Sequence, residues 1–248
     1  MTRAALTTLA ACAIALICGC AKVPAPETIP AYPLMDVSAS LRTLADRAKQ
    51  VRTLSGEGLI TLTRPNGESV RFDAAVAMQP PRRTRIRAWK FGHAVFDLTV
   101  TPDGVWIVAP DEPQRKEQIR AAGVSAGQLA RTWSVLSGGF FDEPGLQTHV
   151  TETQLLIRRE KSGEPTVVCD VDRRTLTPRR YSLLDDRGRS RFSLALDRYR
   201  TFGDVVWPTH LVAKSEGGTV DIELRQVDVN PDLPAAAFTP PRRAEKLP

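Results

Sequence analysis

Long runs in which every second residue is apolar constrain this chain more than any other feature of its sequence. The clearest run extends from Val70 to Met78 and has Arg71 and Asp73 at intervening positions. Successive side chains of a strand point to opposite faces of a sheet, so such runs predict one apolar and one polar face. No helices alternate with them, which favours an antiparallel meander. The predicted strands cover residues 70–78, 85–88, 96–100, 106–108, 155–157, 167–171, 181–184, 192–196, 211–213 and 220–224.

Two segments follow a helical period instead. Between residues 36 and 54 the apolar stripe comprises Val37, Leu41, Leu44, Ala48 and Val51, with Asp36 as the predicted N-cap and Ser55-Gly56 as the predicted end. A second helix is predicted from Ser125 to Ser137, with Leu129, Trp133 and Leu136 on one side. The predicted fold is therefore mainly β with α: a single curved antiparallel sheet, forming an open half-barrel of about ten strands, with helices on the concave side.

The first twenty residues have the layout of a bacterial lipoprotein leader. Arg3 precedes an apolar run from Ala4 to Ile17, and Cys18-Gly19-Cys20 follows. This ending resembles the lipobox, which implies removal of residues 1–19 as a signal peptide and acylation of Cys20. The alternative is a transmembrane helix, but a span needs about 20 apolar residues and this run is shorter. Residues 20–35 contain four prolines and predict an extended tether, and residues 36–248 are expected to form the folded domain.

The charge of the chain limits its expected binding partners, and its cysteine content limits the disulfides it can form. The formal net charge is +6, and an exported, membrane-anchored chain with a basic surface is expected to meet anionic lipid and no nucleic acid. If Cys12 and Cys18 leave with the leader and Cys20 is acylated, only Cys169 remains, so no disulfide can form within the mature chain. Cys169 is expected to be a small buried apolar residue.

Catalytic and metal motifs are weak in this sequence. Gly123 to Gly127 matches the G-x-S-x-G pattern of hydrolases, but the polar segment before it is not a buried strand, and Ser125 is better explained as a helix cap. His93, His149 and His210 stand apart, without metal-ligand spacing, and no phosphate-binding glycine loop is present. The sequence therefore predicts a protein that is not an enzyme and has no metal or cofactor beyond the covalent lipid on Cys20.

The lipobox, tether, amphipathic helix, long meander and mid-chain helix together resemble the LolA/LolB group of periplasmic lipoprotein carriers and outer-membrane lipoprotein receptors, and LolB most closely in layout. Three stretches are more specific: residues 83–108, Ser125 to Gly139 as a lid helix, and Val227 to Pro241 as a closing strand and tail. The resemblance implies a lipid-anchored protein on the periplasmic face of the outer membrane. Its expected partners are membrane lipid, lipoprotein acyl chains and a periplasmic carrier protein, and it is expected to act as a monomer.

The resemblance also implies site residues. In LolB a hairpin loop carries an exposed aliphatic residue before a glycine, which helps to deliver lipoproteins into the membrane; the matching residue here is Phe91, in Trp89-Lys90-Phe91-Gly92-His93. The alternative is an ordinary hairpin aromatic packed on the sheet. The residues expected to line an acyl-chain cavity are Val70, Phe72, Val76, Phe96, Leu98, Trp133 and Leu136, and each could instead be plain core. The alternative function is an envelope sensor or assembly subunit that binds a protein partner with the same fold.

Overall fold

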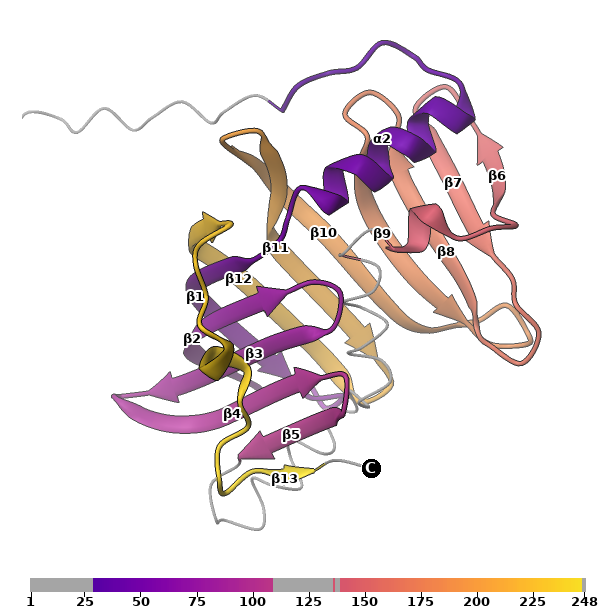
Figure 1. The fold of residues 1–248 in the computed structure, drawn as a ribbon. Helices are drawn as coiled ribbons and strands as arrows, with labels where there is room; N and C mark the ends of the chain where they lie inside the picture. The colour runs from indigo at the N-terminus through magenta and orange to yellow at the C-terminus, as the bar shows by residue number, and fades with distance from the viewer. Residues whose placement is uncertain (1–28, 109–135, 137–138, 247–248) are drawn as a thin grey trace, which may run out of the picture.

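A computed structural model describes residues 29–108, 136 and 139–246, and within these residues 13 strands form one antiparallel sheet (Figure 1). The strands are β1 (Leu54–Thr63), β2 (Ser69–Gln79), β3 (Arg83–Lys90), β4 (His93–Thr101), β5 (Gly104–Val108), β6 (Gln147–Val150), β7 (Gln154–Arg159), β8 (Thr166–Asp172), β9 (Thr177–Leu184), β10 (Ser190–Phe202), β11 (Val205–Ser215), β12 (Gly218–Val229) and β13 (Glu245–Lys246). The helical elements are α2 (Val37–Lys49) and two short 3₁₀ turns, η1 (Gly139–Asp142) and η2 (Ala235–Phe238).

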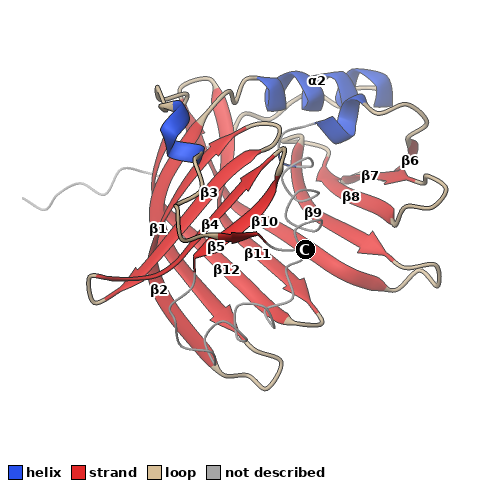
Figure 2. Ribbon diagram, turned by 60° about the horizontal axis from the view of Figure 1, so that its bottom comes forward, coloured by secondary structure: helices blue, strands red, loops and turns tan. Residues whose placement is uncertain are grey.

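Two meanders meet in the middle of this sheet. Strands β1 to β5 run outward to one edge, strands β12 to β6 run outward to the other, and β1 pairs with β12 from Leu54↔Val229 to Thr63↔Thr219. The edges are β13 and β6, which do not pair with each other, so the curled sheet stays open (Figure 2). The predicted open antiparallel sheet is confirmed, but the predicted number of about ten strands is wrong. The ten predicted runs omit β1 and the two edge strands.

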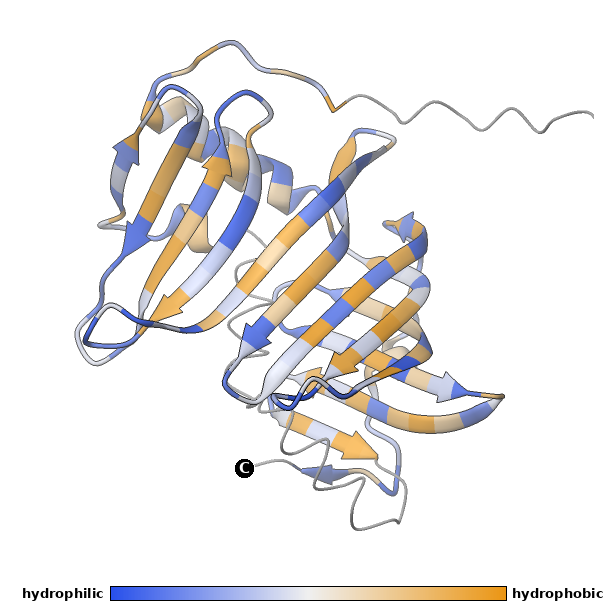
Figure 3. Cartoon of the chain, turned by 180° about the vertical axis from the view of Figure 1, so that it is seen from behind, coloured by the Kyte–Doolittle hydropathy of each residue, from blue (hydrophilic) through white to orange (hydrophobic). Residues whose placement is uncertain are grey.

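The strand register sorts the side chains into an apolar and a polar face. Val76, Ile86, Leu98 and Ile107 form one cross-strand row over β2 to β5 and belong to the apolar face. The neighbouring row passes through Glu57, Ala75, Arg87 and Asp97 and belongs to the polar face. Figure 3 shows the resulting alternation of hydropathy along the strands. The predicted period of two is therefore confirmed over both meanders.

Helix α2 packs on the apolar face, near β9 and β10. Its Leu44 and Ala45 are buried in the same core as Tyr181 and Leu196. Arg47 fixes the helix further, because its Nη1 donates to the carbonyl oxygens of Thr175 (2.9 Å) and Leu176 (3.1 Å). Partial burial lowers the pKa of Arg47 from its ordinary value, although the nearby ring oxygens of Tyr32 and Tyr199 oppose this effect.

The helix begins as predicted but ends earlier. Asp36 is the N-cap, with its Oδ1 accepting from the Ala39 N–H at 2.8 Å, whereas the last helical residue is Lys49 rather than a residue near 54. Asn230, at the end of β12, explains the difference. Its side chain accepts from the Arg52 N–H (2.8 Å) and donates to the Gln50 carbonyl (3.0 Å), so these backbone groups are satisfied outside the helix.

Several predicted features lie outside the described residues. These are the leader, Cys20, and the second predicted helix apart from Leu136, so the placement of helices on the concave side stays a prediction. The described part of the tether is packed: Tyr32 donates its N–H to the Arg174 carbonyl at 2.6 Å, and Met35 lies against the core. No helix among the described residues has both the length and the apolar character that crossing a bilayer requires.

Candidate functional site

The apolar face is closed where α2 covers it. A cavity of about 60 Å³ lies there. The side chains around the cavity include those of Leu44, Leu136, Phe141, Tyr181, Leu196 and Trp207. An acyl chain of ordinary length does not fit into this space, so this end of the face acts as core.

The other end of the apolar face is partly exposed to solvent. We call it the open apolar patch and define it by Leu62, Val70, Phe96, Leu98, Val220 and Ile222, which are half-buried or exposed. The register makes it continuous: Leu62 lies between Val220 and Val70, and Ile222 lies beside Ile60, whose other neighbour is Phe72. Val70 has 37 % of its surface exposed. Among the described residues, the patch is thus an apolar surface built on paired strands, whose side chains are partly accessible.

The structure brings five of the seven predicted lining residues to this end of the face. Val70, Phe72 and Val76 belong to β2, and Phe96 and Leu98 belong to β4. The rings of Phe72 and Phe96 meet edge to face with centroids 6.3 Å apart. Phe72 and Val76 are only 8 % and 7 % exposed, so they form the floor of the patch rather than its surface.

The remaining predicted residues fall elsewhere, and three patch residues were not predicted. Leu136 is buried at the closed end, beneath α2, and Trp133 lies outside the described residues. The residues that sequence reasoning missed are Leu62, Val220 and Ile222. Alternation places Val220 and Ile222 on one face, but their closeness to Val70 follows only from the pairing of β1 with β12.

The tip of the β3–β4 hairpin carries the most exposed large apolar side chain described. Phe91 is 87 % exposed, so it does not pack on the sheet. Phe91 and Gly92 both have positive φ (52° and 77°), the geometry of a type I′ turn, in which Asn-Gly is the preferred pair. A phenylalanine in this region is sterically strained. Lys90 accompanies it, with Nζ 5.6 Å from the ring centroid.

The reactive groups of the described residues are few and separated. Cys169 is fully buried, and burial raises the pKa of its thiol far above the ordinary range. His210 lies on the polar face between Asp221 (Nε2 to Oδ1, 3.1 Å) and Asp197 (Nδ1 to Oδ2, 4.0 Å). In the part of the chain that the structure describes, no three His, Cys, Asp or Glu side chains converge on a metal-sized site. The hydrolase-like Ser125 lies outside that part.

The sequence matches no protein-family model and no curated protein. Solved structures do resemble the fold. A DUF1329 family protein from Desulfovibrio piger aligns with a TM-score of 0.59 at 14% identity, covering 82% of this chain and 97% of the other. A LolA superfamily protein from Nitrosomonas europaea aligns with a TM-score of 0.55 at 13% identity, covering 80% and 97%. An outer membrane lipoprotein-sorting protein domain from Vibrio parahaemolyticus aligns with a TM-score of 0.54 at 11% identity, covering 82% and 97%.

These likenesses concern the fold. At 11–14% identity they carry no residue-level correspondence, but they cover nearly the whole of each similar protein and most of this chain. The expected likeness to the LolA/LolB-like superfamily is therefore confirmed at the level of the fold.

Proposed function

We propose that this protein binds the acyl chains of lipoproteins or lipids on its open apolar patch and passes them to the outer membrane, to whose periplasmic face it is held by a lipid on Cys20. The observation that carries the proposal is the unequal covering of the apolar face. One end is closed by α2, with a cavity of about 60 Å³, while Val70, Phe96 and their neighbours stay accessible. The LolA-like fold, shared with a lipoprotein-sorting domain, supports the same class of function.

The binding free energy that an open patch can supply suits the transfer of an acyl chain better than its storage. Each methylene that leaves water contributes about 0.8 kcal/mol, so eight methylenes contribute about 6 kcal/mol. Association costs about 4–15 kcal/mol in lost translational and rotational freedom. The patch alone therefore holds an acyl chain weakly, and the chain can move on to a membrane.

The hairpin of β3 and β4 connects the patch to the membrane in this proposal. Phe96 and Leu98 of the patch belong to β4, and the same hairpin ends in the exposed Phe91. An exposed aromatic side chain with a lysine beside it suits the boundary between lipid headgroups and acyl chains. Phe91 keeps a strained backbone conformation without making core contacts, which supports a role in function rather than in stability.

The test is native mass spectrometry of the protein released from detergent micelles. The wild-type protein should carry an acyl lipid or bind an added palmitoylated peptide, and Val70→Asp should lose it. Val70 is already partly exposed, so this variant should keep its fold. The matched control is Ser69→Asp, the same charge one residue earlier and on the opposite face. A wild-type protein that binds no acyl ligand would contradict the proposal.

An envelope sensor or assembly subunit that binds a protein partner is the second candidate. It is favoured by β6, an edge strand exposed at all four of its residues, including the apolar Val150. Such an edge can pair with a strand from another chain. Depletion in cells separates the two candidates. Loss of a receptor should leave other lipoproteins missorted, whereas loss of a sensor should leave them sorted and change only a stress response.

A further inference from the structure

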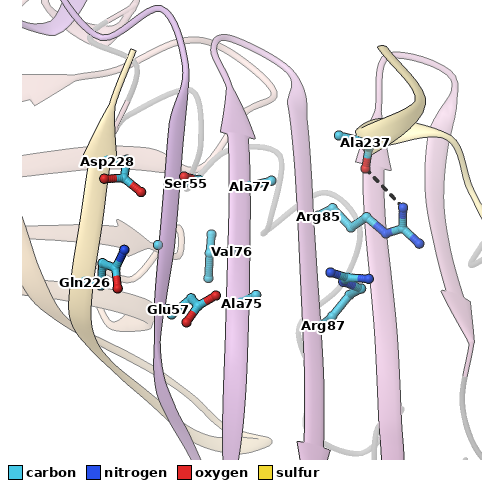
Figure 4. A pocket seen from close by; sticks show the side chains of 11 residues that line it. Ser55, Glu57, Ala75, Val76, Ala77, Arg85, Arg87, Gln226, Asp228 and Ala237 are labelled. Carbon is cyan, nitrogen blue, oxygen red and sulfur yellow. Dashed lines mark hydrogen bonds between the residues drawn. The ribbon is translucent and has the colours of Figure 1, made fainter. Parts of the chain in front are cut away.

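The polar face of the sheet contains a trough that the proposed function does not use (Figure 4). It has a volume of about 300 Å³ and crosses β12, β1, β2 and β3. The register explains why it is hollow: Ala75 lies between Glu57 and Arg87, and Ala77 lies between Ser55 and Arg85. Two small side chains thus form the floor, and longer polar side chains rise on either side.

An ion pair and a hydrogen bond to a backbone carbonyl hold one end of the trough in place. Arg85 forms a two-pronged ion pair with Asp97, with Nε to Oδ1 at 2.9 Å and Nη2 to Oδ2 at 2.7 Å. Its Nη1 also donates to the carbonyl oxygen of Ala237 at 3.2 Å, which ties η2 to this end. The neighbouring Phe238 of η2 is buried. Three of the five N–H donors of Arg85 are therefore engaged within the fold, and the side chain serves as part of the wall.

Within the described residues, the other charged groups of the trough have no hydrogen-bonding or ion-pair partner. Glu57 and Asp228 lie on one side and Arg87 on the other, and none of these three side chains forms a hydrogen bond or ion pair with a described residue. The backbones at Glu57 and Arg87 are two strand spacings apart, about 10 Å. Both side chains rise from the polar face (Figure 4), so the space between the opposite charges is that of a small molecule.

We infer that this trough binds a small zwitterion carrying a primary ammonium group and an oxyanion. The planar fork of Arg87 matches a phosphate or carboxylate, and the carboxylates of Glu57 and Asp228 accept the three donors of an ammonium group. A quaternary ammonium group is usually held by aromatic rings, and the described residues that line the trough include none. Phosphoethanolamine, free or as the headgroup of a phospholipid, has this chemistry and suits a site of this size.

The experiment uses the full-length chain in phosphatidylcholine nanodiscs and follows added phosphoethanolamine by phosphorus NMR. Glu57→Gln and Arg87→Gln should each weaken binding measurably, by up to about fivefold, the upper end expected for losing one solvent-accessible charge contact. Asp73→Asn on β2 and Arg83→Gln on β3, which lie outside the trough, should bind like the wild type. Inorganic phosphate and phosphocholine should bind more weakly than phosphoethanolamine.

Three results would overturn the inference: no binding by the wild type, equal binding of phosphocholine, or unchanged binding by both trough variants. Adding phosphatidylethanolamine to the nanodiscs then identifies the source of the ligand. Competition with free phosphoethanolamine indicates a lipid headgroup, and no competition indicates a free zwitterion. Because the trough and the open apolar patch are on opposite faces, Val70→Asp should leave this binding intact, so the inference and the proposed function can fail separately.

Discussion

A Cβ atom at Gly58 would come within 1.9 Å of the main-chain carbonyl oxygen of Glu223. Strands β1 and β12 form a bulge between the pairs Glu57↔Gln226 and Gly58↔Leu224, and Glu223 pairs with the next residue, Leu59. Glycine in a strand often marks such a close approach of two backbones. The middle of the sheet therefore depends on a residue with no side chain.

Gly58→Ala should destabilise the protein by about 3 kcal/mol, because the contact is with backbone that cannot rotate away. Urea denaturation followed by circular dichroism measures the free energy of unfolding. Thr61→Ala, on the same strand and outside the bulge, should change it by less than about 1 kcal/mol. Equal stability of the two variants would show that β12 moves aside easily.

Phe91→Asn should raise stability by about 1 kcal/mol while impairing function, because asparagine tolerates the left-handed backbone of a type I′ turn better than phenylalanine. In the proposed function the variant also loses the apolar tip, so transfer of a bound acyl ligand from protein to vesicles should slow. Phe91→Leu is the matched control and should keep transfer. Unchanged transfer by Phe91→Asn would argue against a membrane role for the hairpin.

Asp97→Asn should destabilise the protein by about 2 kcal/mol, since hydrogen bonds to charged groups at partly buried sites have about this value. Arg85 and Asp97 side chains are only 19% and 16% exposed, and the hydrogen bond to Asp97 is the main cause that raises the pKa of Arg85. The same substitution should increase hydrogen exchange of η2, which Arg85 holds through Ala237. Asp73→Asn, an exposed carboxylate on β2, should change neither quantity.

Acid should weaken the β8–β9 turn through Asp172. Partial burial alone would raise the pKa of this carboxyl, but hydrogen bonds from Thr175 and Arg179 outweigh burial and hold the pKa below its usual value. An unfolded aspartate titrates at about pH 3.9, so the stabilisation is complete above that pH and is lost as the pH falls through the lower folded pKa.

Asp172→Asn should therefore lose less stability than the wild type between about pH 6 and about pH 3. Urea denaturation at both values measures the difference. Arg179→Gln, which removes the 2.6 Å hydrogen bond to Oδ2, should show an intermediate loss. Identical acid dependence in all three proteins would mean that the turn is already open in acid.

Alternation of apolar residues predicted β2 but not β1, and the difference has a physical reason. Val70 to Met78 reads as a strand because large side chains mark its buried face. In β1 the same face carries Gly56 and Gly58, so the apolar signal disappears where the backbones come closest. The strand at the centre of the sheet was thus missed, along with two short edge strands whose exposed residues show no apolar face.

The strands that carry the candidate site could be predicted from the sequence, but the boundaries of the site could not. Residues on one face of β2 and β4 follow from the period of two, which identified Val70, Phe72 and Phe96. The packing of α2 decides which of these residues form the floor of the patch and which form its surface. Arg47 fixes α2 by hydrogen bonds to backbone carbonyl groups, and such bonds have no sequence signature. The polar trough likewise requires the register, because Glu57 and Arg87 are thirty residues apart.

The pairing of β1 with β12 also governs how the chain can reach this fold. Leu54 finds its partner only when Val229 has been synthesised, so the β1 edge of the first meander stays unpaired through most of translation. Contacts this distant in sequence make folding slow, and open edges invite association with other chains. A chain that stops before Gly218 should therefore form two separate half-sheets, which aggregate. A chaperone that shields the early strands from other chains would help this protein most before β12 is made.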